Sequence, residues 1–183
     1  ESLATPLLMH LPKGLKARGE INEMVQNIDY APTFLELAGA SIPADIQGVS
    51  LVPLLQGKHP KNWRKSIYYH YYEYPAEHNV RRHYGVRNER YKLIHFYGKG
   101  SDRAVQENKY QRTPGTSEYY TYQALKRINY FRDDADIDYY ELYDLQADPD
   151  ELNNIYGKPG TEKVTKRLLK RLGEYRKELK VDE

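Results

Sequence analysis

Apolar and polar residues follow different periods in the two parts of the chain. Near the start, apolar residues form short runs between turn residues, and "TPLLMHL" (residues 5–11) predicts one buried strand. "NIDYAPTFLELAG" predicts a helix with Asp29 as its N-cap, and "SLVPLLQG" predicts a short helical turn capped by Ser50. From Ser66 onward the apolar residues alternate with polar ones, which is typical of half-buried strands.

Four alternating segments predict a small antiparallel sheet. "SIYYHYYEY" predicts the first strand, "HYGVRNERYKLIHFY" predicts two strands joined at Asn88-Glu89, and "YYELYDL" predicts the last. Residues 98–138 carry polar and glycine residues with only a weak helical period from Ser117 to Phe131, so we interpret them as an insertion. The final segment, "TEKVTKRLLKRLGEYRKELK", predicts an amphipathic helix with Thr161 as its N-cap.

Together these elements predict an α+β fold in two parts. Residues 1–63 would be an incomplete part that contains one buried strand and helices. Residues 64–183 would be a smaller subdomain, in which the C-terminal helix packs on an approximately four-stranded sheet. Because the chain begins without Met and its first residues already have the pattern of a strand inside a domain, we expect it to be a piece of a longer protein.

Composition excludes several classes of chemistry. The chain has no cysteine, so disulfides, thiolate zinc sites and cysteine nucleophiles are excluded within it. Its formal net charge is only +2, so we do not expect it to bind nucleic acid. No apolar stretch approaches the roughly 18 residues of a membrane span, so a membrane is not an expected partner. The 19 tyrosines suit half-buried sheet faces as well as sugar- or protein-binding surfaces.

Candidate functional residues gather in "EHNVRRH", just before the second predicted strand. His78 and His83 flank a short segment that contains Arg82, in what we expect to be a loop or strand start. Imidazole and guanidinium groups together form a cationic, donor-rich surface that suits sulfate, phosphate, carboxylate or sugar hydroxyls. His95, in "KLIHFY", is interpreted as a partly buried structural histidine. The sequence contains no P-loop, H-E-x-x-H or G-x-S-x-G motif.

Four segments resemble, in order, the C-terminal portion of the type I sulfatases of the alkaline-phosphatase-like superfamily. They are "ESLATPLLMHLP", "NIDYAPTFLELAGASIPADIQGVSLVPLLQG", "HYGVRNERYKLIHFY" and "YYELYDLQADPDELNNIYG". The pair D-x-x-P-T-x-L-x-x-A-G and E-L-Y-D-L-x-x-D-P-x-E-x-x-N is specific, although either half alone is weaker. "EYPAEHNVRRHYGVRNERYKLI" is most similar to the branch that contains glucosamine-6-sulfatase and heparan-type sulfatases.

The resemblance implies that the whole protein is a sulfuric ester hydrolase that removes sulfate from a glycan. In such enzymes the larger N-terminal part is an α/β domain, and residues 1–63 would be its incomplete C-terminal end. That larger part holds calcium and a formylglycine made from a C/S-x-P-x-R motif. This chain lacks that motif, so we expect it to be inactive alone and to bind neither cofactor. The implied partners are a sulfated carbohydrate and the N-terminal catalytic domain of the same protein, in the bacterial periplasm or outside the cell.

The resemblance also implies a role for the candidate residues. His83 and His78, with Arg82 as the weaker candidate, would lie at the rim of the substrate pocket and bond to sugar hydroxyls or a carboxylate. Two other readings stay open. The chain could be a non-catalytic module that binds sulfated glycan, or a structural cap on the catalytic domain.

Overall fold

The computed structural model describes residues 5–10, 19–74, 80–99, 113–127 and 136–181. The chain divides into two compact units, Glu1–Ile67 and Tyr68–Glu183. This division falls close to the predicted boundary after residue 63. The assignment of the first unit to a larger α/β domain stays a prediction.

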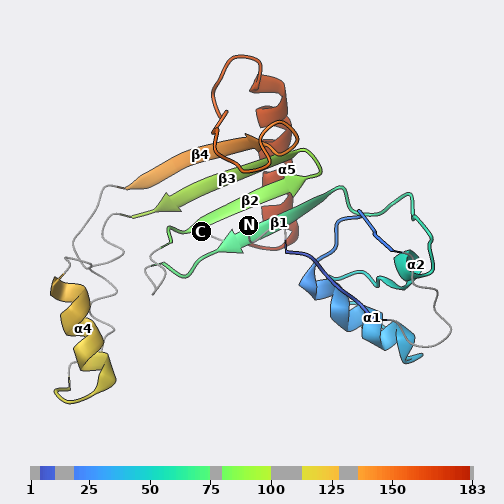
Figure 1. Ribbon diagram of the computed structural model, residues 1–183, viewed down its shortest axis with the longest axis horizontal. Helices are drawn as coiled ribbons and strands as arrows, with labels where there is room; N and C mark the ends of the chain where they lie inside the picture. The colour runs from blue at the N-terminus through green and yellow to red at the C-terminus, as the bar shows by residue number, and fades with distance from the viewer. Residues whose placement is uncertain (1–4, 11–18, 75–79, 100–112, 128–135, 182–183) are drawn as a thin grey trace. The chain divides into compact units, whose positions relative to one another are not determined.

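The first unit contains a 3-10 turn and two short helices. They are η1 (Asn27–Asp29), α1 (Tyr30–Leu37) and α2 (Val52–Leu55), and both helices lie in the segments predicted to be helical (Figure 1). The Ser50 hydroxyl accepts a hydrogen bond from the backbone N–H of Val52 at 3.2 Å, as expected of a residue that caps a helical turn. The core of the unit is a small apolar cluster of Leu51, Leu54 and Leu55, against which Leu7, Met9, Ile21, Val25 and Trp63 pack.

The strand predicted at residues 5–11 is wrong. Residues 5–10 adopt no strand, and Leu11 lies outside the described residues. The side chains do alternate, since Leu7 and Met9 pack on the apolar cluster whereas Leu8 is 93% exposed. A strand also needs a neighbour to share its backbone hydrogen bonds, and no described segment pairs with residues 5–10. The pattern therefore predicted which side chains face inward. It could not show that, among the described residues, the segment has no neighbouring strand to share its backbone hydrogen bonds.

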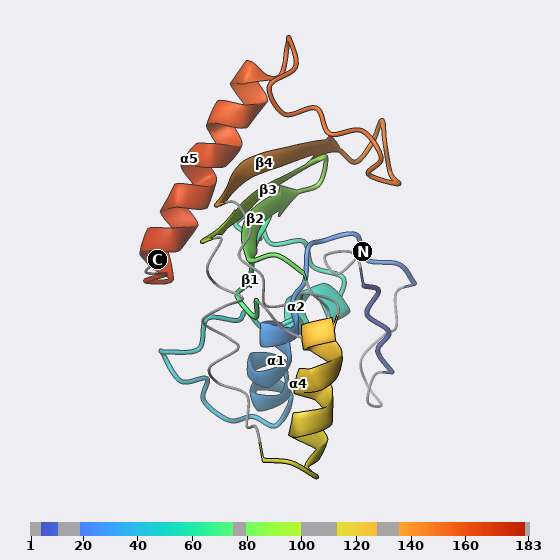
Figure 2. The same cartoon turned by 90° about the vertical axis from the view of Figure 1, so that its left-hand side faces the viewer.

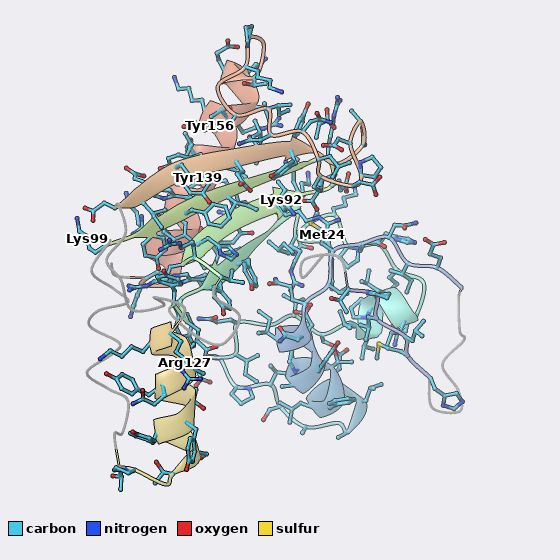
Figure 3. All side chains as sticks on the ribbon, turned by 60° about the vertical axis from the view of Figure 1, so that its left-hand side comes forward. Met24, Lys92, Lys99, Arg127, Tyr139 and Tyr156 are labelled. Carbon is cyan, nitrogen blue, oxygen red and sulfur yellow. The ribbon has the colours of Figure 1, made fainter. Side chains whose placement is uncertain are left out.

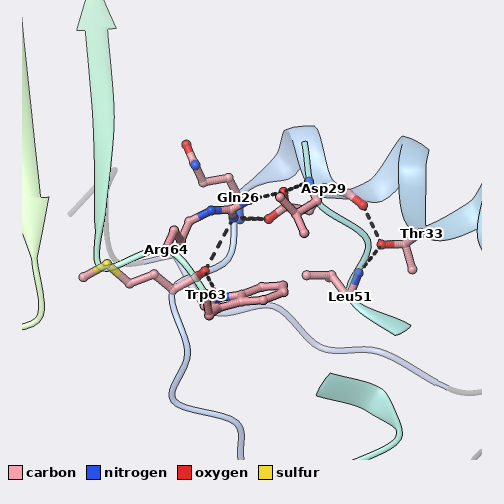
Figure 4. A network of polar contacts seen from close by, with 8 residues as sticks. Gln26, Asp29, Thr33, Leu51, Trp63 and Arg64 are labelled. Atoms are coloured by element: carbon pink, nitrogen blue, oxygen red, sulfur yellow. Dashed lines mark hydrogen bonds and ion pairs between the residues drawn. The ribbon is translucent and has the colours of Figure 1, made fainter. Parts of the chain in front are cut away.

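A buried ion pair joins the start of α1 to Arg64 (Figure 4). The side chain of Asp29 has no exposed surface, and the Arg64 guanidinium contacts both carboxylate oxygens, with Nη2 at 2.6 Å from Oδ1. The backbone N–H groups of Gln26 and Val49 donate to the same carboxylate at 2.7 and 2.9 Å. Asp29 precedes α1 as predicted, but its carboxylate makes no capping bond to that helix because these four donors already occupy its oxygens.

Thr33 and Gly48 complete this network beside α1. The Thr33 hydroxyl donates to the carbonyl of Asp29 at 2.5 Å and accepts from the backbone N–H of Leu51 at 2.9 Å. A side chain at Gly48 would place its Cβ 1.9 Å from the carbonyl oxygen of Ile28, so only glycine fits there. The polar residues of the D-x-x-P-T motif thus hold the first unit together.

The second unit is built on a four-stranded sheet with strand order β1-β2-β3-β4 (Figure 1). The strands β2, β3 and β4 pair antiparallel, and helix α5 (Glu162–Glu178) lies across one face of the sheet (Figure 2). This arrangement confirms the predicted α+β class. The strands are β1 (Ser66–Tyr71), β2 (His83–Asn88), β3 (Tyr91–Gly98) and β4 (Ile137–Asp144).

The β2–β3 hairpin turns one residue later than predicted. Arg87 pairs with Lys92, so the loop residues are Glu89 and Arg90 rather than Asn88 and Glu89. The side chain of Asn88 accepts hydrogen bonds from the N–H groups of Arg90 and Tyr91, at 2.9 and 2.7 Å. The hairpin closed in this way pairs His83 with Phe96, and Tyr84 with His95.

Helix α5 covers the face of the sheet that carries the apolar core. Val86, Leu93 and Leu142 have no exposed surface, and Leu168 and Leu172 of α5 are buried against them. The helix begins directly after Thr161, as predicted, although the Thr161 hydroxyl donates to the carbonyl of Lys158 instead of capping the helix. The predicted amphipathic spacing is therefore confirmed by packing.

The segment after β4 folds back on the sheet through side-chain hydrogen bonds. Asn154 accepts from the N–H of Leu142 at 3.0 Å and donates to the carbonyl of Tyr140 at 3.2 Å. Glu151, at a positive φ of 56°, forms an ion pair with Lys92. The polar residues of the D-P-x-E-x-x-N motif thus have structural roles, and the single helical turn considered for this segment is absent from it.

The predicted insertion contains one described helix. Helix α4 (Ser117–Arg127) begins at the residue where the weak helical period begins. Residues 100–112 and 128–135, on either side of it, lie outside the described residues.

Candidate functional site

His83, the first residue of β2, packs among aromatic rings on the face of the sheet opposite α5. Its imidazole stacks on Tyr71 at 5.5 Å between ring centroids, and lies 5.0 Å from the ring of Phe96, its cross-strand partner. Phe96 in turn stacks on Tyr139 of β4 at 4.7 Å, with 13° between the ring planes. Tyr71, His83, Phe96 and Tyr139 therefore form one aromatic row that crosses all four strands.

The hydrogen bond of His83 fixes which ring nitrogen is available. Nδ1 lies 2.8 Å from the backbone carbonyl oxygen of Arg81. Since a carbonyl only accepts, we assign the proton to Nδ1, which leaves Nε2 as an acceptor in the neutral ring and a donor when the ring is protonated. None of the residues that the structure describes bonds to Nε2, so this atom can serve a ligand.

The structure does not bring all three predicted residues together. Arg82 precedes His83, and its carbonyl accepts from the N–H of Tyr97 at 3.1 Å, which extends the strand pairing. Successive side chains of an extended segment point to opposite faces, so the side chain of Arg82 points away from the aromatic row. Arg81 is the arginine on the side of His83, and its guanidinium lies 4.7 Å from the ring centre of Tyr74. His78 lies outside the described residues.

The other end of the same sheet face is occupied by internal pairs. Lys92 is only 6% exposed and lies 5.6 Å from the ring centre of Tyr143, in addition to its ion pair with Glu151. Burial lowers the pKa of the Lys92 ammonium, and the positive charge of Arg87 lowers it further. Burial and a hydrogen bond to Glu141 raise the pKa of the Tyr143 hydroxyl to about 12. Lys92, Tyr143, Glu141 and Glu151 therefore interact with one another, and they form a cluster beside the aromatic row.

Figure 3 shows Lys92 on β3 and Tyr139 on β4. The register pairs Lys92 with Tyr143 and Phe96 with Tyr139, so all four side chains belong to one face of the sheet. Tyr139 is 45% exposed, whereas Lys92 is buried. The exposed part of this face is therefore the end that carries His83 and the aromatic row.

His95 lies on the opposite face, under α5, and has no free ring nitrogen. Its Nδ1 lies 2.6 Å from the Tyr84 hydroxyl, and its Nε2 lies 2.6 Å from Oδ1 of Asp138. The ring also stacks on Tyr140 at 4.1 Å, with 6° between the planes, and the residue is 9% exposed. His95 is thus a structural histidine, in agreement with its interpretation from sequence.

The chemistry that the aromatic row offers is hydrogen bonding and ring stacking. Within the described ranges, no group of three or more His, Asp or Glu residues comes together that could hold a metal ion. The residues present therefore do not fit the calcium site that the family resemblance implies for the whole protein. In the same described part of the chain, no helix is both long and apolar enough to cross a membrane.

Sequence reasoning missed the aromatic partners of His83. Tyr71, Phe96 and Tyr139 lie far from His83 along the chain and only the sheet brings them together. A usable signal was present in the hairpin, because a turn at Glu89-Arg90 places Phe96 opposite His83. Shifting the turn by one residue breaks that pairing.

Comparisons with known proteins agree on one family. The model of the family described as "N-sulphoglucosamine sulphohydrolase, C-terminal" matches residues 1–114 and 106–178. The chain is 42% identical over 177 residues to an N-acetylglucosamine-6-O-sulfatase of Bacteroides thetaiotaomicron, covering 96% of this chain and 25% of that protein. It is 30% identical over 158 residues to the human N-acetylglucosamine-6-sulfatase, covering 84% and 26% respectively.

One solved structure combines a similar sequence with a similar fold. It shows a protein in complex with its substrate D-glucosamine-2-N,6-O-disulfate, and it is 43% identical to this chain with a TM-score of 0.62. The similarity covers 85% of this chain and 24% of that one. The chain therefore spans about a quarter of the length of the relatives that it matches.

Proposed function

Because this chain belongs to the sulfatase family described as "N-sulphoglucosamine sulphohydrolase, C-terminal", we propose that it is the C-terminal part of an enzyme that removes sulfate from a glycan. The identity of 42% to an N-acetylglucosamine-6-O-sulfatase supports a substrate that contains sulfated glucosamine. Such an enzyme would act on polysaccharide outside the cytoplasm, and we place the longer protein in the periplasm or outside the cell.

The catalytic centre would lie in the N-terminal domain of that longer protein. No C/S-x-P-x-R motif occurs in this chain, and the described residues form no group that could hold calcium. When present in the catalytic domain, the calcium ion would stabilise negative charge on the sulfuryl group. This chain would add support and contacts to the substrate.

The substrate contact that we propose is made by His83. One observation carries it: Nδ1 is fixed by the carbonyl of Arg81, so that Nε2 keeps a defined role at an exposed end of the sheet. An oriented imidazole can bond to a sugar hydroxyl when neutral, and to a sulfate or carboxylate oxygen when protonated. His78 and Arg82 stay proposed contacts of lower rank, because Arg82 points away from the row and His78 lies outside the described residues.

Replacing His83 in the longer protein tests this role. We expect His83→Ala to lower kcat/KM for 6-O-sulfated glucosamine about tenfold or more, since a hydrogen bond to a charged group contributes about 1.5–3 kcal/mol. His59→Ala is the matched control, because His59 is exposed and, among the described residues, bonds to Glu23 alone. Unchanged kcat/KM for His83→Ala would rule out the contact.

Sulfate release tests the enzyme itself. We expect the longer protein to encode C/S-x-P-x-R upstream of residue 1 and to release sulfate from 6-O-sulfated glucosamine, measured by ion chromatography. The chain of 183 residues alone should release none. A longer protein without that motif and without sulfate release would leave a glycan-binding module, which calorimetry with a sulfated oligosaccharide would detect.

A further inference from the structure

Tyr139 ends the aromatic row at the edge of the sheet. β4 is the last strand of the sheet order, and Tyr139 stacks one ring face on Phe96. The residue is 45% exposed, and no second aromatic ring among the described residues stacks on it. Its outer ring face is therefore covered by no aromatic ring of the described residues.

The row holds this ring in place. The register sets His83 opposite Phe96 and Phe96 opposite Tyr139, so each ring limits the rotamers of the next. A ring that is fixed before binding loses little conformational entropy when a ligand stacks on it. Tyr139 is thus an already ordered flat surface with a polar hydroxyl at its tip.

We propose that the outer face of Tyr139 is a stacking subsite for the sugar ring next to the one that His83 contacts. The inference rests on the proposed function. The apolar face of a pyranose exposes C–H groups with slight positive charge, which suit the negative face of an aromatic ring. β2 and β4 are two strand spacings apart, about 10 Å, so His83 and Tyr139 are too far apart to hold the same sugar.

Charges of both signs lie near Tyr139. Burial and then the negative charge of Glu141 raise the pKa of the Tyr139 hydroxyl, whereas the smaller effect of Arg81 lowers it. Glu141 also accepts a hydrogen bond from the Tyr143 hydroxyl at 2.9 Å. A glycan on this face would therefore place its sulfate groups toward Arg81 and away from Glu141.

Two substrates distinguish the effect of this subsite from the effect of the substrate contact made by His83. In the longer protein, sulfate release would be measured with 6-O-sulfated glucosamine and with a disaccharide that carries the same sulfated sugar. We expect Tyr139→Ala to lower kcat/KM about threefold to tenfold for the disaccharide, mainly through KM, and to leave the monosaccharide unchanged. Tyr139→Phe should keep most of the disaccharide activity, because the ring remains.

Tyr120→Ala is the control, since Tyr120 is an exposed tyrosine of α4 outside the aromatic row, and it should change neither substrate. Equal losses on both substrates would show that Tyr139 acts through the packing of the row and would overturn the proposal. No loss on either substrate would overturn it as well.

A wild-type protein that releases no sulfate would contradict the proposed function but not yet the subsite. In that case calorimetry would measure how tightly wild type and Tyr139→Ala bind the same sulfated disaccharide. Weaker binding by Tyr139→Ala than by wild type supports the subsite, and equal binding overturns it.

Discussion

His83 and His95 lie on neighbouring strands of one sheet, and their surroundings differ in almost every respect. Both nitrogens of His95 are bound, to Tyr84 and Asp138, and α5 covers its face of the sheet. His83 has one nitrogen bound to the backbone carbonyl of Arg81 and lies in a row that ends at an exposed ring. The same residue type is thus part of the core on one face and available to a ligand on the other.

The difference follows from where α5 packs. The helix needs an apolar face, and Val86, Leu93 and Leu142 provide it, so polar groups on that side must find partners inside the protein. The opposite face carries Lys92 and Glu141, which do not suit a packed helix. Function is therefore expected on the face that the helix leaves open.

The largest expected effect concerns two adjacent residues on opposite faces. Leu93 is fully buried under α5, and Ile94 is half-buried on the other side of the sheet. We expect Leu93→Ala to lower the free energy of unfolding by about 2–5 kcal/mol, and Ile94→Ala by about half as much or less. Urea unfolding of both variants measures the two costs. Equal costs would mean that the two faces are equally well packed.

The two histidines give a smaller but more specific contrast in stability. We expect His95→Ala to cost about 1–3 kcal/mol, because it removes the buried hydrogen bond to the Tyr84 hydroxyl and the stacking on Tyr140. His83→Ala should cost about 1 kcal/mol or less, since it removes ring contacts and one part-buried hydrogen bond to the carbonyl of Arg81. Urea unfolding of both variants measures the two costs. A larger cost for His83→Ala than for His95→Ala would make His83 the structural histidine.

Sequence alone predicted much of this fold because its strands and last helix have clear periods. The alternation in "HYGVRNERYKLIHFY" identified β2 and β3, and the spacing of Leu168 and Leu172 identified the buried side of α5. Prediction from sequence failed where the interacting residues lie far apart along the chain. The strand at residues 5–11 lacked a pairing segment, and the carboxylate of Asp29 binds Arg64 instead of capping α1.

The candidate site was predicted only in part for the same reason. "EHNVRRH" pointed to His83, but its aromatic neighbours cannot be seen in a single segment. The contact with Phe96 depends on the β2–β3 register, which a one-residue error in the turn changes. The opposite orientation of Arg82 follows from the same strand geometry.

The smallest expected effect is a dependence of stability on pH, through Tyr143 on the face of the sheet opposite α5. The pKa of Tyr143 is raised to about 12, above its value in the unfolded chain, so the unfolded state loses its proton first. Stability should therefore fall as pH rises from about 10 to about 12. Tyr143→Phe has no proton to lose, and its stability should fall less over that range. Identical pH curves from urea unfolding of both proteins would show that burial does not perturb Tyr143.

The most direct test of the account is a crystal structure of the longer protein with 2-N,6-O-disulfated glucosamine bound. We predict an oxygen of the ligand within about 3.2 Å of His83 Nε2, while His95 keeps its bonds to Tyr84 and Asp138. A structure in which another part of the protein covers His83 Nε2, with the sugar bound elsewhere, would contradict the claim that this face of the sheet contacts the substrate.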